Sequence, residues 1–330
     1  MQQARLSLPL NDWQNELQHP INEVRYLIDR LKLPTTISAD TTQQRFGLRV
    51  PNSYVARMRL GDMTDPLLRQ VLPLLEEQQV IENFSTDPLN ERLAEKTPQL
   101  LCKYQGRVLL MTTNQCAIHC RYCFRRHYPW TKIGDLLNNQ IIFDKIQADH
   151  SIHEVILSGG DPLTLTDHDL AELVQRLAQI RHLKRLRIHS RMPIVLPQRI
   201  NETLLASLTA TRLPIVMIIH ANHAQEIDET VGIALNQLIQ AGIIVLNQSV
   251  LLRGINDNVI TLVNLSETLF SYRVLPYYLH LLDRVHGAAH FEVAMETVVN
   301  LLEQLRCQLP GYLVPQFVRE IAGTPYKQPL

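Results

Sequence analysis

Residues 116–128 read Cys-Ala-Ile-His-Cys-Arg-Tyr-Cys-Phe-Arg-Arg-His-Tyr and hold three of the five cysteines in this chain of 330 residues. The gaps between Cys116, Cys120 and Cys123 are short, so the three thiolates can converge on one small object without closing a long loop. Four-iron clusters are normally held by four thiolates. Three thiolates therefore predict a cluster with one iron left open to an exogenous ligand.

A zinc site is the alternative interpretation of this stretch. The three cysteines could be joined by His119 or His127 to give four ligands. Structural zinc sites usually pair two ligand couples across a spacer, and no second couple is visible in the sequence. Cys102 and Cys307 stand alone among apolar residues, and we expect both to be buried, inert thiols.

The composition of the chain argues against several classes of protein. The chain has 32 basic and 32 acidic residues, which predicts no general attraction to nucleic acid or to an acidic membrane. Its hydrophobic content of 45% is typical of a soluble globular protein. The first residues do not resemble a secretory signal, and no apolar run is long enough to span a bilayer. Clustered cysteines without an export signal predict a cytoplasmic location and a metal or redox role.

Residues 1–100 are predicted to form a mostly helical region. A helical apolar stripe ends before Pro34, and Asp65-Pro66 and Asp87-Pro88 place a proline near the first turn of further helices. The stripe consists of Ile21, Val24, Leu27, Ile28 and Leu31. No catalytic constellation is visible here, so we expect a helical layer packed on the rest of the protein.

From Arg107 onward, β-rich runs alternate with helical patterns. Thr166-x-x-Asp169 is a capping-box-like helix start, and Gly242 stops a later helix. The runs recur about every thirty residues after a longer first interval, which is the size of a βα unit. They are Arg107–Met111, Glu154–Leu157, Leu186–His189, Ile215–Ile219, Ile243–Leu246 and Tyr277–Leu281. Six such units predict an α/β fold with a partial (β/α)6 TIM-type barrel over residues 101–310.

Polar residues follow every one of these runs. Carboxyl ends of parallel strands meet at one edge of a sheet, so we expect these residues to form the wall of an active site. After the cysteine loop come Ser158-Gly159-Gly160-Asp161, His189-Ser190-Arg191, His220-Ala221-Asn222-His223, Asn247-Gln248-Ser249, and His280 with Asp283. The paired glycines let the backbone approach a ligand closely, although a tight βα turn would also explain them.

The C-x3-C-x2-C spacing, with an aromatic residue before the last cysteine, resembles the signature of radical S-adenosylmethionine enzymes. In that family the open iron binds the amino and carboxylate groups of S-adenosylmethionine, and electron transfer releases a 5′-deoxyadenosyl radical. Over about residues 45–330 the chain is similar to the lysine 2,3-aminomutase family. The matching segments include Cys120-Arg-Tyr-Cys-Phe-Arg-Arg, Leu157-Ser-Gly-Gly-Asp-Pro-Leu, Arg187-Ile-His-Ser-Arg and Asn247-Gln-Ser-Val-Leu-Leu-Arg-Gly-Ile-Asn-Asp.

This resemblance implies that Lys327 holds pyridoxal 5′-phosphate as a Schiff base, and that residues 311–330 fold back over the barrel mouth. It also implies that Arg125 holds a substrate carboxylate, while Asp283 and Glu320 hold a distal ammonium. Glu320 stands where the family more usually has an aspartate, which leaves the pocket depth open. The remaining cofactor contacts that the resemblance implies are Ser158, Gly159, Gly160, Asp161, Arg107, Arg191 and Gln248.

The resemblance further implies conversion of L-lysine to β-lysine with the help of an electron donor. The most similar branch, marked by Arg45-Phe-Gly-Leu-Arg-Val-Pro, supplies β-lysine for modification of elongation factor P by its lysyl-ligase. Longer clostridial relatives bind zinc between subunits, but the matching loop here reads Asn256-Asp257-Asn258, so we expect no zinc. An aminomutase for another amino acid, such as glutamate, and a zinc-stabilised scaffold without catalysis are the alternatives. The two acids favour a diammonium substrate.

Overall fold

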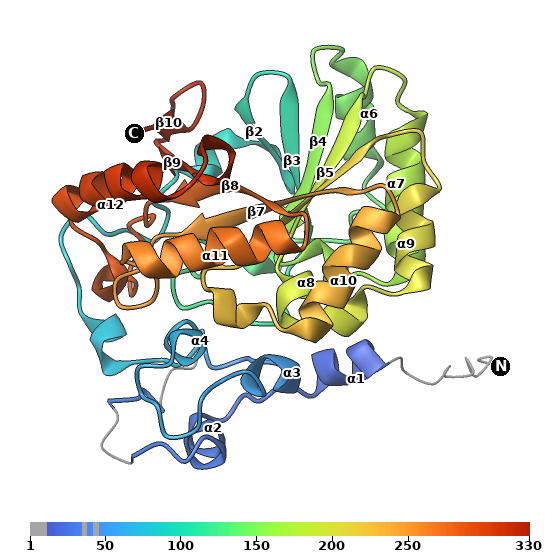
Figure 1. Ribbon diagram of the computed structural model, residues 1–330. Helices are drawn as coiled ribbons and strands as arrows, with labels where there is room; N and C mark the ends of the chain where they lie inside the picture. The colour runs from blue at the N-terminus through green and yellow to red at the C-terminus, as the bar shows by residue number, and fades with distance from the viewer. Residues whose placement is uncertain (1–11, 35–37, 42–45) are drawn as a thin grey trace.

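The computed structural model describes residues 12–34, 38–41 and 46–330. Arg45, which begins the segment similar to the elongation factor P branch, lies outside the described residues. The rest forms a ten-stranded sheet whose strands follow one another in sequence order (Figure 1). The strands are β1 (Glu95–Thr97), β2 (Leu100–Tyr104), β3 (Arg107–Thr113), β4 (Glu154–Gly159), β5 (Arg185–Ser190), β6 (Ile215–Ile219), β7 (Ile244–Val250), β8 (Leu275–His280), β9 (Gln316–Arg319) and β10 (Gln328–Pro329).

Strands β3 to β9 run parallel, and their apolar residues stand side by side across the sheet. In β3, for example, Leu110 pairs with Leu157 of β4. The six β-rich runs predicted from the sequence are β3 to β8, so the partial α/β barrel is confirmed. The antiparallel strands β1 and β2 extend the sheet on one side, and β9 and β10 extend it on the other. Because the strand order ends at β1 and at β10, the barrel is open.

Helices follow the parallel strands and cover the outside of the sheet (Figure 1). They are α6 (Gln140–Ala148), α7 (Asp167–Gln179), α8 (Met192–Val195), α9 (Glu202–Thr209), α10 (Glu229–Gln240), α11 (Val259–Ser271) and α12 (Met295–Gln308). The predicted cap of α7 is present, since Asp169 N donates to Thr166 Oγ1 at 3.1 Å. Beyond α10, Gly242 has the predicted left-handed conformation, with φ of +81°. None of the described helices has the length and apolar character needed to cross a membrane.

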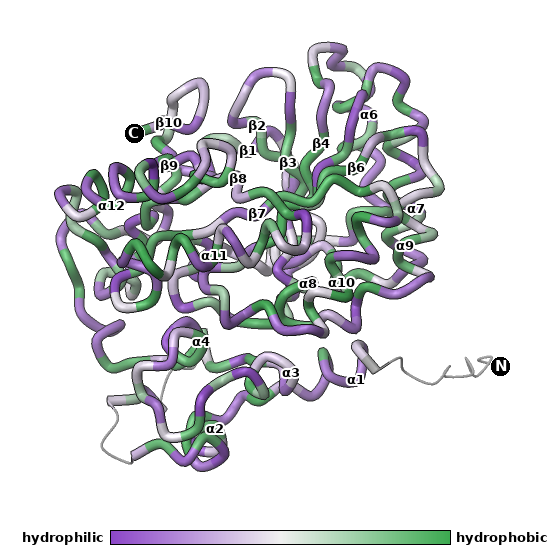
Figure 2. Tube along the Cα trace, viewed as in Figure 1, coloured by the Kyte–Doolittle hydropathy of each residue, from purple (hydrophilic) through white to green (hydrophobic). Residues whose placement is uncertain are grey.

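The distribution of hydrophobic residues matches the arrangement of the sheet and its covering helices. The central strands are mostly hydrophobic, whereas the surrounding helices alternate between hydrophobic and hydrophilic positions (Figure 2). Helix α7 buries an apolar stripe that includes Leu170 and Leu177. Strand β4 is buried along its whole length, as expected for a parallel strand covered on both faces.

The N-terminal segment lies against one end of the barrel (Figure 1). Its helices are α1 (Asp12–Gln18), α2 (Val24–Arg30), α3 (Asn52–Val55), α4 (Pro66–Arg69) and α5 (Glu91–Ala94), with a 3-10 turn, η1 (Leu75–Gln78). These helices are shorter than a mostly helical layer implies. Prolines explain much of the difference, because the residue before a proline is disfavoured in the α conformation. Pro66 stands in the first turn of α4 as predicted, and Asp65 caps that helix. The helix expected at Asp87-Pro88 begins only at Glu91.

A buried ion group fixes this segment to the cysteine loop. The side chain of Glu77, on η1, is fully buried, and its carboxylate accepts Arg121 Nε at 2.8 Å and Arg126 Nη2 at 2.6 Å. Burial alone would raise the pKa of Glu77, but the two guanidinium groups outweigh it and lower that pKa. The Phe46 ring lies 4.9 Å from the Arg121 guanidinium and 5.0 Å from that of Arg126. Two arginines that flank Cys123 are therefore held by one carboxylate.

We predict that Glu77→Ala lowers the free energy of unfolding by about 3–5 kcal/mol, because it leaves two buried guanidinium groups without their counterion. The matched control is Glu292→Ala, which removes an exposed pair with Arg284 and should cost less than about 1 kcal/mol. Urea unfolding of both variants measures the difference. Equal losses would show that the Glu77 group does not hold the segment in place.

Candidate active site

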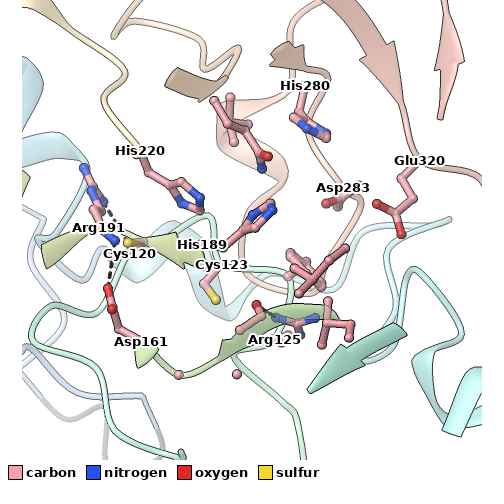
Figure 3. Close-up of a pocket in the computed structure, with 18 of the residues that line it drawn as sticks. Cys120, Cys123, Arg125, Asp161, His189, Arg191, His220, His280, Asp283 and Glu320 are labelled. Carbon is pink, nitrogen blue, oxygen red and sulfur yellow. Dashed lines mark hydrogen bonds between the residues drawn. The ribbon is translucent and has the colours of Figure 1, made fainter. Parts of the chain in front are cut away.

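A cavity of 660 Å³ lies at the carboxyl ends of the parallel strands and reaches into the barrel. Five polar residues expected in the wall of the site do not line it: Ser190, Asn222, His223, Asn247 and Ser249. The residues expected to bind the cofactors or the substrate do line it, although they come from all parts of the barrel and from the C-terminal tail. They are Arg107, Cys116, Cys120, Cys123, Arg125, Ser158, Gly159, Gly160, Asp161, Arg191, Gln248, Asp283, Glu320 and Lys327. Figure 3 shows several of them facing the same space.

The three cysteines lie on the loop between β3 and α6. Among the described residues, no three His, Cys, Asp or Glu side chains come close enough together to hold a single metal ion. In an iron–sulfur cubane each thiolate binds a different iron, so its ligands stand further apart than those of one zinc ion. All three thiols line the same cavity, so they can hold one group between them. Cys102 is half-buried, Cys307 is exposed rather than buried, and neither lines the cavity.

The loop favours the uncharged form of two of these thiols, Cys116 and Cys123. Burial raises the pKa of Cys116, and it raises the pKa of Cys123 to about 11, with neighbouring cysteines adding to both effects. Metal binding releases such protons, because the thiolate is the ligand. The loop itself is preset: Arg49 Nε donates to the Cys116 carbonyl at 2.7 Å, and Arg121 N donates to the Gln70 carbonyl at 2.9 Å.

The two glycines after β4 pack closely against the cysteine loop. Gly159 has φ of +121°, and a Cβ on Gly160 would stand 2.1 Å from the Gln115 carbonyl oxygen. Both residues line the cavity, but the close approach that requires glycine is made to the protein backbone. The expected approach to a ligand is thus only part of their role. They let the β4 loop support the segment that carries Cys116.

Asp161 turns its carboxylate toward the protein. The carboxylate accepts Ser190 Oγ at 2.7 Å, Arg191 N at 2.7 Å and Leu163 N at 3.0 Å. These contacts occupy the oxygens that a cofactor would need. Burial raises the pKa of Asp161, and the hydrogen bonds oppose that rise without cancelling it. The Asp161 carboxylate therefore joins the ends of β4 and β5, and the residue also lines the cavity in which its cofactor contact is expected.

A chain of alternating charges crosses the cavity. Arg125 pairs with Glu91 through two hydrogen bonds of 2.7 Å, and Lys103 Nζ lies 2.9 Å from Glu91. Lys103 also lies 2.7 Å from one oxygen of Glu320, whose other oxygen lies 2.6 Å from Lys327 Nζ. Arg125 and Glu320 therefore both have protein partners, which the sequence analysis does not anticipate.

Glu91 and Lys103 are site residues that sequence reasoning missed. Glu91 belongs to the region in which no catalytic group is expected, yet it is almost fully buried against Arg125. Burial alone would raise the pKa of Glu91, but Arg125 and Lys103 lower it to about 2. Lys103 stands on β2, a strand absent from the predicted barrel. No local signal in the sequence marks either residue.

Asp283 behaves differently from the other acids. It faces Glu320 across the cavity (Figure 3). Burial first, and the negative charge of Glu320 second, raise the pKa of Asp283 to about 7. Asp283 is therefore partly protonated at neutral pH. A cation placed between Asp283 and Glu320 would ionise it.

Three histidines expected in the wall of the site also line the cavity. The Nε2 atoms of His189, His220 and His280 are buried and have no hydrogen-bond partner among the described residues. Burial, with nearby cations adding to it, lowers their pKa values, that of His220 to about 4. Each is a neutral imidazole that can still make a hydrogen bond, as expected in a site that receives a polar ligand. Their position at the carboxyl ends of β5, β6 and β8 is the signal by which the sequence predicts them in the site.

Two further contacts suit an anionic cofactor. Arg107 Nε is buried without a partner among the described residues, and the Arg107 guanidinium stacks 4.9 Å from the Tyr104 ring. A guanidinium with an unused donor in a cavity fits a phosphate group. The Lys327 amine lies in the same cavity, and Gln248 reaches it from β7. These residues fit pyridoxal 5′-phosphate, with its phosphate and its aldehyde.

The C-terminal tail brings Lys327 to the cavity. Strand β10 pairs antiparallel with β9, with Gln328 opposite Arg319, and Leu330 N donates to the Phe317 carbonyl at 3.1 Å. Tyr326, Lys327 and Pro329 all line the cavity as a result. The tail thus folds back onto the barrel, in the direction that the resemblance implies.

Known proteins similar to this chain point to one family. A family described as "4Fe-4S single cluster domain" matches residues 104–190. The chain is 45% identical over 323 residues to L-lysine 2,3-aminomutase of Escherichia coli (strain K12), covering 97% of this chain and 94% of that protein. It is 33% identical over 324 residues to L-lysine 2,3-aminomutase of Clostridium subterminale, covering 97% of this chain and 78% of that protein.

Among solved structures, a radical SAM methyltransferase from Sphaerobacter thermophilus superposes with a TM-score of 0.45 and 16% identity, covering 67% of this chain and 68% of that one. The sequence relatives are far closer and match the chain almost from end to end. On the strength of that identity and coverage, the chain belongs to the lysine 2,3-aminomutase family.

Proposed function

We propose that this protein is an L-lysine 2,3-aminomutase, an isomerase that moves the α-amino group of L-lysine to the β-carbon. The observation that carries the proposal is one cavity that combines three cluster-type thiols, a lysine amine and two acids facing each other. The 45% identity to a lysine 2,3-aminomutase over nearly the whole chain supports the same reaction.

We assign the cofactors to residues as follows. Cys116, Cys120 and Cys123 would hold a 4Fe-4S cluster, and the Ser158 to Asp161 segment would lie beside its open iron. Lys327 would hold pyridoxal 5′-phosphate, with Arg107 on its phosphate. When bound, the cluster and S-adenosylmethionine supply a radical that abstracts hydrogen, while pyridoxal 5′-phosphate carries the migrating nitrogen.

The substrate contacts that we propose lie at the two ends of the chain of alternating charges. Arg125 would hold the lysine carboxylate beside Ser158, whose Oγ accepts Arg125 Nη1 at 3.0 Å. Asp283 and Glu320 would hold the distal ammonium, which can take the place beside Glu320 that the Lys327 ammonium fills in this structure. The enclosing walls keep water away from the reacting carbon and limit its movement. An α-amino acid with an acidic side chain would meet like charge at Asp283 and Glu320.

We further propose a place for this reaction in the cell. The chain shares 45% of aligned positions with the Escherichia coli relative and 33% with the clostridial one, which supports the branch that supplies β-lysine for elongation factor P. That role implies a cytoplasmic location, a reducing partner for the cluster and an indirect link to the lysyl-ligase. We also propose a role for each part of the chain. Residues 1–100 would support the cysteine loop, residues 101–310 would form the barrel that encloses the reaction, and residues 311–330 would close over Lys327.

The cluster assignment predicts that Cys116→Ala, Cys120→Ala and Cys123→Ala each lose the bound iron and the visible charge-transfer absorption, because three thiolates are the minimum set. Anaerobic reconstitution followed by iron analysis is the measurement. Cys102→Ala and Cys307→Ala are matched controls outside the cavity and should keep wild-type iron. Full iron in any of the first three variants would contradict the assignment.

The Lys327 assignment predicts that borohydride fixes pyridoxal 5′-phosphate to the peptide that contains Lys327. Lys327→Ala should keep its iron yet lose the cofactor absorption and the amino migration. Lys103 is the internal control, because its amine pairs with the same Glu320 carboxylate. Labelling of Lys103 in the wild-type protein would show that the tail does not supply the cofactor lysine.

Anaerobic turnover of L-lysine with S-adenosylmethionine and a reductant tests the function itself, with β-lysine as the expected product and glutamate unreactive. Because ionised Asp283 is needed to bind an ammonium, the Michaelis constant for lysine should fall as the pH rises through about 7. Below that pH it should rise by roughly tenfold per unit.

Asp283→Asn should raise the Michaelis constant and remove this pH step. Asp144→Asn, an exposed acid on α6, should leave both unchanged. Turnover of glutamate in preference to lysine would refute the substrate assignment, and a pH step that survives in Asp283→Asn would place it on another group.

A further inference from the structure

Arg191 places a buried guanidinium directly on a cysteine of the loop. It follows β5, is only 5% exposed, and its Nη1 donates to Cys120 Sγ at 2.7 Å (Figure 3). The contact joins the third βα unit of the parallel barrel to the loop after the first. The sequence analysis assigns Arg191 only a general cofactor contact, and the reaction chemistry makes no use of this guanidinium.

The position of Arg191 is fixed from several sides. Its Nη2 donates to Glu226 Oε2 at 2.8 Å and to Gln70 Oε1 at 2.6 Å, and its backbone N donates to Asp161 at 2.7 Å. With so many partners the guanidinium cannot easily turn away from the Cys120 sulfur.

Arg191 and Glu226 form an ion pair, and both side chains carry charge. Burial alone would lower the pKa of Arg191, but Cys120 and the neighbouring oxygen groups outweigh it, so the pKa is raised. Glu226 is fully buried as well, and Arg191, with hydrogen bonds from Asn222 and Gln70, outweighs burial to hold its pKa low. The guanidinium is thus a permanent positive charge at the sulfur, and Glu226 is a permanent negative charge behind it.

Such a pair acts on a cluster in a definite direction. Reduction adds one electron, so the reduced cluster is the more negative form and gains more from a positive charge and an N–H···S hydrogen bond. A guanidinium on a ligating sulfur therefore raises the reduction potential. A carboxylate behind the guanidinium offsets part of that rise.

We propose that Arg191 is a positioning residue that sets the reduction potential of the cluster held at Cys116, Cys120 and Cys123, and that Glu226 limits its effect. The inference rests on the proposed function for the presence of the cluster. It adds a role for two residues that neither hold iron nor touch the lysine substrate in that proposal. Without Arg191 the cluster would accept its electron less readily.

The test is a redox titration of the reconstituted protein, without S-adenosylmethionine or lysine, followed by electron paramagnetic resonance of the reduced cluster. At the wild-type midpoint potential, Arg191→Met should lower the ratio of reduced to oxidised cluster at least tenfold, equivalent to about 59 mV. Glu226→Gln should raise the same ratio, because it removes the offsetting charge and keeps an amide of the same shape.

The matched control is Arg57→Gln. Arg57 is also a buried guanidinium beside this network, but it donates to the backbone oxygens of Glu226 and Ile194 and contacts no cysteine. In Arg57→Gln the ratio of reduced to oxidised cluster should change less than twofold. A general loss of packing would move the variants in the same direction, whereas the proposal requires opposite shifts in Arg191→Met and Glu226→Gln.

Iron content separates the outcomes. If Arg191→Met keeps its iron and its ratio is unchanged, the proposal is overturned. If Arg191→Met fails to hold iron, Glu226→Gln decides: a raised ratio supports the proposal, and an unchanged or lowered ratio overturns it. A wild-type protein that binds no cluster would overturn the proposed function first, and this inference with it.

Discussion

The pairing of loop arginines with buried carboxylates is the constraint on which the site depends. The cysteine loop has no helix or strand of its own to fix it, and three of its arginines lie next to the last two cysteines in the sequence. Glu77 neutralises Arg121 and Arg126, and Glu91 neutralises Arg125. Both glutamates come from the segment before the barrel. That segment therefore supplies the countercharges without which the loop could not be buried.

In the cavity, too, basic side chains are paired with acidic ones. Arg125, Lys103 and Lys327 stand against Glu91, Glu320 and Asp283, while the histidines stay neutral and add no charge. In a water-poor site each charge depends strongly on its neighbours. Asp283 shows this most clearly, because burial and the charge of Glu320 outweigh the attraction of Lys327 and Lys103 and raise its pKa to about 7. A ligand cation placed beside Asp283 would favour its ionised form.

The sequence predicts the parts of this structure that local signals encode. Strands β3 to β8 and the ends of α7 and α10 follow from periodicity and capping residues, which act over a few positions. Glu91 and Lys103 could not be found this way, because Glu91 meets Arg125 across 34 positions and Lys103 meets Glu320 across 217. Lys327 was identified through family resemblance alone. The constraint on Gly160 also depends on a neighbouring loop, so its cause appears only in three dimensions.

Glu320 and Lys327 sit on the two arms of one hairpin, just after β9 and just before β10. The β10 arm is held to β9 by only two residue pairs, and Pro329 is exposed. A ladder this short opens at a small fraction of the free energy needed to unfold the barrel. The tail can thus swing out while β3 to β8 stay folded, and Lys327 leaves the cavity with it. Exchange of the cavity's contents would then be paced by the opening of this short ladder, on a timescale separate from that of the enclosed chemistry.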